Sequence, residues 1–263
     1  MIPDVQSGSS RIRQYLKKVG VRNVEVPLKY GVGSFSVYTD LAPDVRGSHL
    51  SRLVEFVERL SGQDLDSLPQ SVDSMMKDLR DSLKCELVYV KCRTKFPFRV
   101  AAPQTSREGW MYAKVTLDMV GRPDTPTVCD WTVEVPITTA CPCSLELVRF
   151  SGKQGIPHSQ RGLARVTVRT SVEETEVVAR LTQLVRDTVV APYPVLKRVD
   201  ELEFALKLHK TPMFVEDAAR LLHNRLDKED WVQDFVVVVE TFESIHPHNA
   251  VAVTCKGVQY GLR

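Results

Sequence analysis

The hydrophobic and polar positions of this chain follow two periods, and the order in which the periods occur is repeated. In the first half, two alternating runs are followed by two runs at helical spacing and then by two more alternating runs. Alternation predicts a half-buried strand, and apolar residues three and four apart predict an amphipathic helix. We therefore predict four strands and two helices, namely strands at 23–29, 34–41, 86–95 and 110–120 and helices at 48–61 and 69–83.

The second half shows the same order with one helix added. Its patterns predict strands at 127–138, 163–170, 235–241 and 250–256, and helices at 172–190, 195–210 and 214–226. The helix at 195–210 is an insertion, so the element order β-β-α-α-β-β occurs twice, without evident sequence identity between the halves. Helices grouped between hairpins predict an α+β fold, in which an antiparallel sheet carries its helices on one face. Pro27 places the first strand at a sheet edge, because proline cannot donate to a ladder.

The repeated order divides the chain into three parts. Residues 1–21 are polar and basic and are predicted to form an N-terminal arm or a short surface helix. Residues 22–122 form a first module and residues 123–263 a second. A loop with glycine and proline, at 141–162, interrupts the first hairpin of the second module.

Composition narrows the class of protein. The 263 residues are 43% hydrophobic and 26% charged, which is typical of a globular chain. With 35 Lys and Arg against 33 Asp and Glu the net charge is +2, so no nucleic-acid partner is indicated and any phosphate must be bound by a local cluster. Six cysteines without an N-terminal apolar segment favour a reducing compartment, hence a cytoplasmic protein. The longest apolar run, 235–239, is too short to span a bilayer.

Two cysteines and a histidine suggest a metal site. Cys141 and Cys143 flank a proline after the strand at 127–138, and His158 follows in the same polar loop. Thiolate and imidazole are typical ligands of transition metals. Cysteines two apart rarely bridge each other, and no second cysteine pair is present to close a four-ligand zinc site. An open three-ligand site is therefore one interpretation, and two structural thiols beside an unrelated histidine are the other.

Four more residues are candidates for chemistry, and each also has a structural interpretation. Glu201 opens the inserted helix, where it could simply face solvent. Glu216 stands at a helix N-terminus, where a carboxylate complements the helix dipole. Glu243 and His246 lie in the turn 242–249, which could be solvent-exposed. From their spacing alone, both interpretations remain open.

Five motifs in order resemble the type IB GTP cyclohydrolase I family. They are Thr-Thr-Ala-Cys-Pro-Cys at 138–143, Pro-His-Ser-Gln-Arg-Gly at 157–162, Leu-Lys-Arg-x-Asp-Glu at 196–201, Pro-x-Phe-Val-Glu-Asp at 212–217 and Phe-Glu-Ser-Ile-His at 242–246. The resemblance implies a tunnelling fold with two modules per chain, assembled into a homotetramer around a tunnel. It also implies hydrolysis of GTP to 7,8-dihydroneopterin triphosphate and formate, for folate or modified tRNA base synthesis.

The resemblance assigns roles to individual residues. It implies that Cys141, His158 and Glu201 bind zinc, manganese or iron, and that Glu216 binds guanine. Glu243 and His246 fall on active-site positions that transfer protons, and Cys143 is a supporting thiol. The cations nearest these residues in sequence are candidates for binding the triphosphate, namely Lys153, Arg161, Lys197 and Arg198.

The chain departs from the family pattern in two places, and other activities compete with GTP cyclohydrolase activity. The loop between Cys143 and His158 is longer than in bacterial members, and His-Pro-His replaces the expected His-Asn-His, so His248 receives no role. An archaeal-like variant making a cyclic phosphate from GTP is one alternative. A tunnelling-fold nitrile reductase, with a cysteine nucleophile and a nicotinamide cofactor, would bind no metal at Cys141. A non-catalytic metal-stabilised scaffold is the third, and the charge balance speaks against nucleic-acid binding.

Overall fold

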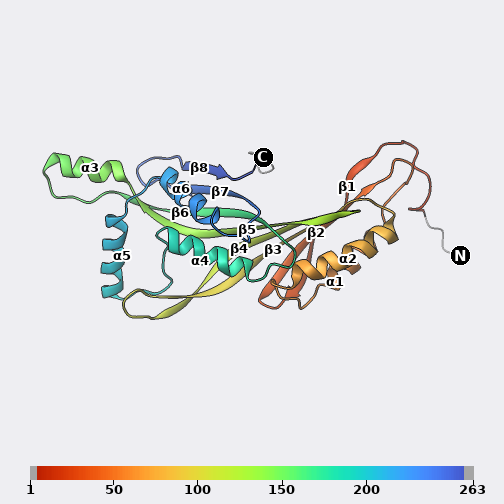
Figure 1. Ribbon diagram of the computed structural model, residues 1–263, viewed down its shortest axis with the longest axis horizontal. Helices are drawn as coiled ribbons and strands as arrows, with labels where there is room; N and C mark the ends of the chain where they lie inside the picture. Colours follow the sequence, from red (N-terminus) through yellow and green to blue (C-terminus); the bar gives the residue numbers. More distant parts are fainter. Residues whose placement is uncertain (1–4, 258–263) are drawn as a thin grey trace. The chain divides into compact units, whose positions relative to one another are not determined.

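The computed structural model describes residues 5–257 and contains the predicted order of strands and helices (Figure 1). The first half consists of β1 (Leu16–Leu28), β2 (Gly31–Leu41), α1 (Leu50–Glu58), α2 (Leu68–Leu83), β3 (Val88–Ala101) and β4 (Glu108–Arg122). The second half consists of β5 (Thr125–Ala140), α3 (Pro142–Ser151), β6 (Ser159–Thr170), α4 (Val177–Thr188), α5 (Arg198–Lys210), α6 (Val215–Leu226), β7 (Asp234–Thr241) and β8 (Ala250–Cys255). The doubled order is confirmed, with α3 and α5 inserted in the second copy.

The strands pair in sequence order, from β1 at one edge to β8 at the other. Neighbouring strands are antiparallel, as in the β6–β7 ladder, which runs in register from Gly162 opposite Thr241 to Arg169 opposite Asp234. Pro27 lies in the edge strand β1, opposite Val32 of β2, as the missing donor of proline predicts. The antiparallel α+β class is therefore confirmed.

Packing divides the chain into two compact units that do not follow the sequence order. The first unit takes in residues up to 95, 115–131 and 170–176, and the second takes in 96–114, 132–169 and the chain from 177 onward. The predicted modules 22–122 and 123–263 are consecutive in sequence, whereas these units interleave. The division into two modules therefore stays a prediction. The predicted arm includes residues 1–4 and the second predicted module includes residues 258–263, and both of these ends lie outside the described residues.

The helices of both units bury the apolar stripes that their periodicity predicts. In the first unit, α2 buries Val72, Met76 and Leu79 beneath its polar face. In the second unit, α4 buries Leu181 and Val185, and α6 packs against β7 and β8. Among residues 5–257, no helix combines the length and apolar character needed to cross a membrane.

We expect Leu222→Ala to destabilise the second unit strongly. Leu222 on α6 is fully buried, whereas its neighbour Leu221 is 44% exposed. Truncating a buried leucine removes apolar contacts and leaves a cavity, which costs about 2–5 kcal/mol. The matched variant Leu221→Ala should change the free energy of unfolding by only about 0.5 kcal/mol. Urea denaturation of both variants measures the difference, and equal losses would contradict the packing described.

The described residues 5–21 contain no helix, although a short surface helix is one of the two predictions for the N-terminal segment. Residues 6–10 form backbone hydrogen bonds with 44–47, among them Ser10 N–H to Asp44 O at 2.8 Å. The first strand then begins at Leu16, not at residue 23. The prediction of a helix here is wrong, because the backbone donors and acceptors of this polar stretch are satisfied by pairing with a distant segment.

The predicted loop at 141–162 contains a helix, which is the second correction. In α3, Pro142 occupies the first turn and Gly152 ends the helix with φ 66° in the left-handed region. Both are usual at those positions, because proline lacks an N–H that the first turn leaves unbonded and glycine accepts positive φ. None of the residues of α3 is buried. Without a buried face the helix has no apolar period, so the pattern indicated only a loop.

Candidate functional site

The end of β5 places Cys141 at the beginning of α3. Cys141 is the N-cap residue, with extended backbone angles, and its sulfur accepts a hydrogen bond from Ser144 N at 3.5 Å. One residue earlier, Ala140 is fully buried and its carbonyl oxygen accepts from Met213 N at 3.1 Å. The thiol therefore stands at a point where the strand, α3 and the segment before α6 meet.

Backbone hydrogen bonds bring His158 beside this cysteine. Cys141 N–H donates to the carbonyl oxygen of His158 at 3.0 Å. The hydroxyl of Ser144 accepts from His158 N at 3.1 Å and donates to the Cys141 carbonyl at 3.3 Å. The turn that carries the thiol and the strand start that carries the imidazole are thus joined by two hydrogen bonds, and a third closes the turn itself.

A chain of polar side chains leads from His158 to Glu243. His158 Nδ1 lies 3.1 Å from Gln160 Oε1 and 3.2 Å from Ser244 Oγ. Gln160 Nε2 lies 3.1 Å from Thr139 Oγ1 and 3.4 Å from Glu243 Oε1. Glu243 Oε1 also accepts from the hydroxyl of Thr241 at 3.0 Å. The network joins β5, β6 and β7 beneath the site.

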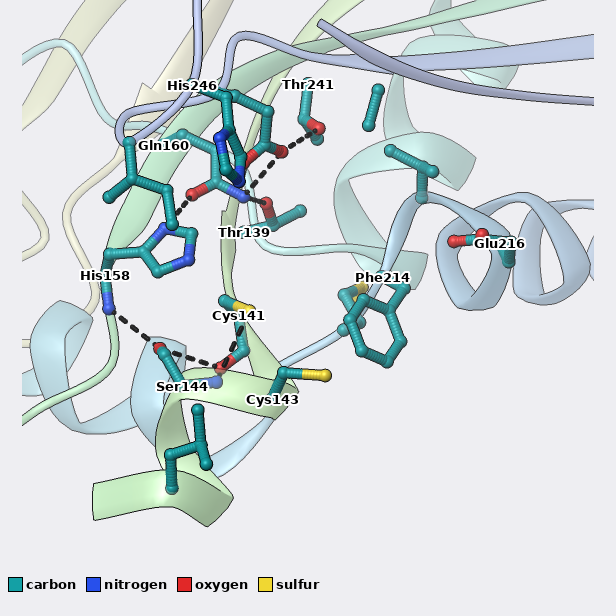
Figure 2. A pocket seen from close by; sticks show the side chains of 16 residues that line it. Thr139, Cys141, Cys143, Ser144, His158, Gln160, Phe214, Glu216, Thr241 and His246 are labelled. Carbon is teal, nitrogen blue, oxygen red and sulfur yellow. Dashed lines mark hydrogen bonds between the residues drawn. The ribbon is translucent and has the colours of Figure 1, made fainter.

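These side chains line a pocket of about 360 Å³ within the second unit (Figure 2). The lining residues are Thr139, Cys141, Cys143, Ser144, Leu147, His158, Gln160, Met213, Phe214, Val215, Glu216, Thr241, Glu243, Ile245, His246 and Ala250. In Figure 2 the free edge of the His158 ring is turned toward Cys141, whereas Glu216 projects from α6 on the opposite side. Six of the candidate residues from the sequence therefore share one cavity.

The remaining candidates lie outside this cavity. Arg161, Lys197, Arg198 and Glu201 are exposed and are not among the lining residues. Lys153 is exposed in the turn after α3. Across the part of the chain that the structure describes, no group of three His, Cys, Asp or Glu side chains could hold a metal ion. The structure thus joins Cys141 and His158, and does not bring Glu201 to them.

The orientation of α5 explains where Glu201 lies. At the C-terminal end of α5, Leu208 is buried in a cluster with Ala140 and Val190, close to Cys141. Glu201 precedes Leu208 by two helical turns, which is about 10 Å along the helix axis. Within one chain, α5 therefore directs its N-terminal end, with Glu201, away from the thiol.

The N-terminal end of α5 is held by Asp200, which the sequence analysis did not single out. Its fully buried carboxylate accepts from Gln104 N and Thr105 N, both at 2.9 Å, from the Thr105 hydroxyl at 2.7 Å and from Lys197 N at 2.9 Å. Burial by itself raises the pKa of Asp200, but the hydrogen bonds from Thr105, Lys197 and Gln104 outweigh it and hold the pKa well below its usual value of 3.8. The turn between β3 and β4 is thereby tied to the helix that carries Lys197, Arg198 and Glu201.

We expect Asp200→Asn to loosen this tie, because the amide NH₂ would face backbone donors. The stabilisation by Asp200 is complete above the unfolded carboxyl's pKa, near 3.8, and is lost as the pH falls toward the lower folded pKa. The variant should therefore unfold at lower urea than the parent at neutral pH, and the gap should narrow only below pH 3.8. Glu203→Gln, on the same helix, is the control. A gap that already closed in mildly acid solution would contradict the assignment.

Three of the other cysteines are held as thiols by burial. Burial raises the pKa of the Cys92 and Cys129 thiols to about 12 and that of Cys85 to about 11. Thiolate is the form that binds metals and attacks electrophiles. All six cysteines are free. Cys141 and Cys143, which line the pocket, are therefore the better candidates for chemistry.

The turn between β7 and β8 places two histidines together. The rings of His246 and His248 are stacked, with centroids 5.0 Å apart and planes inclined by 10°. Only His246 lines the pocket, and both residues are exposed. The His-Pro-His turn thus places a second imidazole beside the candidate residue, and the departure from the family pattern concerns only the proline between them.

The fold is similar to that of solved urate oxidases. A uricase from Bacillus fastidious matches with a TM-score of 0.50 at 6% identity, over 95% of this chain and 94% of that one. A highly active mutant of Bacillus sp. TB-90 urate oxidase gives a TM-score of 0.50 at 9% identity, over 92% and 99% of the two chains. At such low identity the likeness concerns the fold alone. The chain has a tunnelling fold, as the motifs implied.

The sequence decides the family within that fold. A model of the family described as type I GTP cyclohydrolase folE2 matches residues 2–252. GTP cyclohydrolase FolE2 of Thermosipho africanus is 34% identical over 95% of this chain and 96% of its own. The FolE2 of Staphylococcus aureus (strain Newman) is 30% identical over 95% and 86% of the two chains. The chain belongs to the type I GTP cyclohydrolase FolE2 family, and the resemblance of the five motifs is confirmed.

Proposed function

We propose that this protein is a GTP cyclohydrolase that converts GTP and water to 7,8-dihydroneopterin triphosphate and formate. The observation that carries the proposal is that one pocket is lined by Cys141, His158, Glu216, Glu243 and His246. These residues come from four of the five motifs and from separate elements of the second unit. Membership of the FolE2 family supports the same conclusion.

The donor pair fits a divalent metal ion of intermediate softness. A thiol and an imidazole that face the same space suit zinc, iron or manganese, with zinc favoured by the sulfur. Cys141 and His158 would hold such an ion, and Glu201 would add the carboxylate. The ion would supply Lewis acidity toward the water that attacks C8 of guanine.

The chain's own groups would bind the base and move protons. Glu216, in the first turn of α6, would accept the two donors on the guanine edge. His246 lines the pocket and would give and take protons at N7 and N9 as the imidazole ring opens. Glu243, held by Gln160 and Thr241, would orient the attacking water. Cys143 lines the same pocket and would support the later proton transfers.

The triphosphate would extend from this pocket toward cations that lie outside it. Arg161, Lys197 and Arg198 are exposed and carry positive charge close in sequence to the candidate ligands. Guanidinium groups bind phosphate oxygens in pairs, and ammonium groups bind them as point charges. The Asp200 anchor would set the position of Lys197 and Arg198 for this contact.

We further propose that Glu201 reaches the metal from a second copy of the chain in a homotetramer. Glu201 is exposed and lies outside the pocket that Cys141 lines in its own chain, and both β1 and β8 are edge strands of the sheet, which proteins normally pair or cover. Light scattering should show a tetramer. Cys141→Ala and Glu201→Ala copies, each inactive, should recover part of the activity when co-expressed. Mixed tetramers without activity would contradict a shared site.

One assay tests the activity itself. Purified protein is incubated with GTP and a divalent ion, formate is measured, and the pterin is identified by mass. Equimolar formate and dihydroneopterin triphosphate are expected. A cyclic-phosphate product would instead indicate the archaeal-like reaction, and the absence of formate would overturn the proposal in favour of a scaffold or a nitrile reductase. We expect a cytoplasmic location, because a reducing compartment keeps Cys141 a free thiol.

A further inference from the structure

The two nitrogens of His158 have different surroundings. Nδ1 lies within hydrogen-bond distance of Gln160 Oε1 and Ser244 Oγ, at 3.1 Å and 3.2 Å. The opposite edge of the ring, with Nε2, is turned toward Cys141 and the open pocket (Figure 2). A neutral imidazole carries its proton on one nitrogen only, so the position of this proton decides whether Nε2 presents a lone pair to the pocket.

The amide of Gln160 has one orientation that satisfies all its neighbours. A carboxylate oxygen only accepts hydrogen bonds, so the amide atom beside Glu243 Oε1 must be the NH₂ group. The same NH₂ group donates to Oγ1 of Thr139, a residue that is 1% exposed. The amide oxygen is then left facing His158 Nδ1. Because that oxygen can only accept, Nδ1 must donate.

Ser244 does not oppose this arrangement. A hydroxyl can donate or accept, so Ser244 Oγ accommodates either tautomer of His158. Gln160 cannot turn its amide without setting its oxygen against Glu243 Oε1, which already accepts from Thr241. Opposing two acceptors in a half-buried site disfavours the other tautomer by roughly tenfold or more.

We propose that Gln160 is a positioning residue: Glu243 fixes the orientation of the Gln160 amide, and the amide oxygen in turn fixes the tautomer of His158. It holds the imidazole proton on Nδ1 and leaves the Nε2 lone pair facing Cys141. This lone pair would be a preformed nitrogen ligand for the metal, and that consequence rests on the proposed function. Hydrogen bonds that orient a ligating histidine commonly change metal affinity about 10- to 100-fold. Glu243 thus acts on both the reacting water and the ligand that binds the metal.

Nitrogen NMR of the metal-free, full-length protein tests the relay directly. Histidine labelled with ¹⁵N distinguishes the tautomers, and a His158→Asn sample assigns the signal. We expect the parent protein to carry the proton of His158 on Nδ1. Gln160→Met, similar in length and without the amide, should give a mixture of tautomers and bind zinc about 10- to 100-fold more weakly in a chelator competition.

Two further variants separate the relay from a merely structural role. Thr139→Val removes an acceptor of the Gln160 amide and keeps Glu243, so His158 should retain the Nδ1 proton. Glu243→Gln lets the two amides turn together, so the single tautomer should be lost, and this variant decides the matter if Gln160→Met fails to fold. A proton on Nε2 in the parent, or unchanged spectra in both Gln160→Met and Glu243→Gln, would overturn the proposal. Neither measurement uses GTP, so a failure of the proposed activity is detected separately.

Discussion

Cys141→Ala should lose bound metal and GTP turnover together, each by more than about 100-fold, because loss of a ligand exceeds the usual effect of residues that only orient one. Metal removed from the parent by a chelator should have the same consequence. Because a sulfur, nitrogen and oxygen set is intermediate in softness, more than one of zinc, iron and manganese should restore activity. Elemental analysis and formate release, measured on the same samples, test both statements.

The structure supplies a variant that separates metal binding from the folding of α3. Cys141 also caps α3, so alanine removes both the ligand and the cap. Cys141→Ser keeps a good N-cap residue but replaces the thiolate with a poor ligand, so it should fold like the parent and still lose the metal. Cys143→Ala, whose thiol in Figure 2 is directed away from His158, should keep its metal. Full turnover by a demonstrably metal-free sample would disprove the assignment.

Glu216→Ala should abolish the discrimination between GTP and ATP. Guanine presents N1–H and an amino group, and an ionised carboxylate offers two acceptors in matching positions. Adenine sets an acceptor against the same carboxylate, and leaving such groups unpaired costs about 1–3 kcal/mol each. Sites built on such pairs reject mismatched ligands by roughly 10⁴- to 10⁵-fold. The ratio of kcat/KM for the two nucleotides measures this effect.

The neighbouring carboxylate provides the control for the Glu216 variants. Asp217 accepts a hydrogen bond from Phe214 N at 3.0 Å and so holds the start of α6. Asp217→Asn would weaken this hydrogen bond without removing a contact to the base. Glu216→Gln should be nearly as damaging as Glu216→Ala, because its NH₂ group would oppose a guanine donor. Metal content should be unchanged in both. Parent-like turnover of GTP by Glu216→Ala, or loss of its metal, would show that the residue has another role.

Part of the site could be predicted because its residues belong to recognisable local motifs. Cys141, His158, Glu216, Glu243 and His246 all reach the pocket from motifs identified in the sequence. The residues that connect them were missed. Thr139 stands in the first motif and Thr241 ends a predicted strand, but nothing local shows which other group each hydroxyl bonds. Gln160 stands inside a recognised motif, but its role depends on Glu243, 83 residues away.

Local pattern alone therefore determined the doubled order of strands and helices, the edge position of β1 and the family. These depend on periodicity, proline chemistry and short motifs, which act over a few residues. Tertiary structure decided which of two adjacent acidic residues, Asp200 and Glu201, is buried. It also decided that α3 is a helix without a buried face and that Glu201 lies outside the pocket that holds Cys141. Each of these depends on contacts between segments far apart in the chain, such as the turn at 104–105 on Asp200, and no local periodicity encodes such contacts.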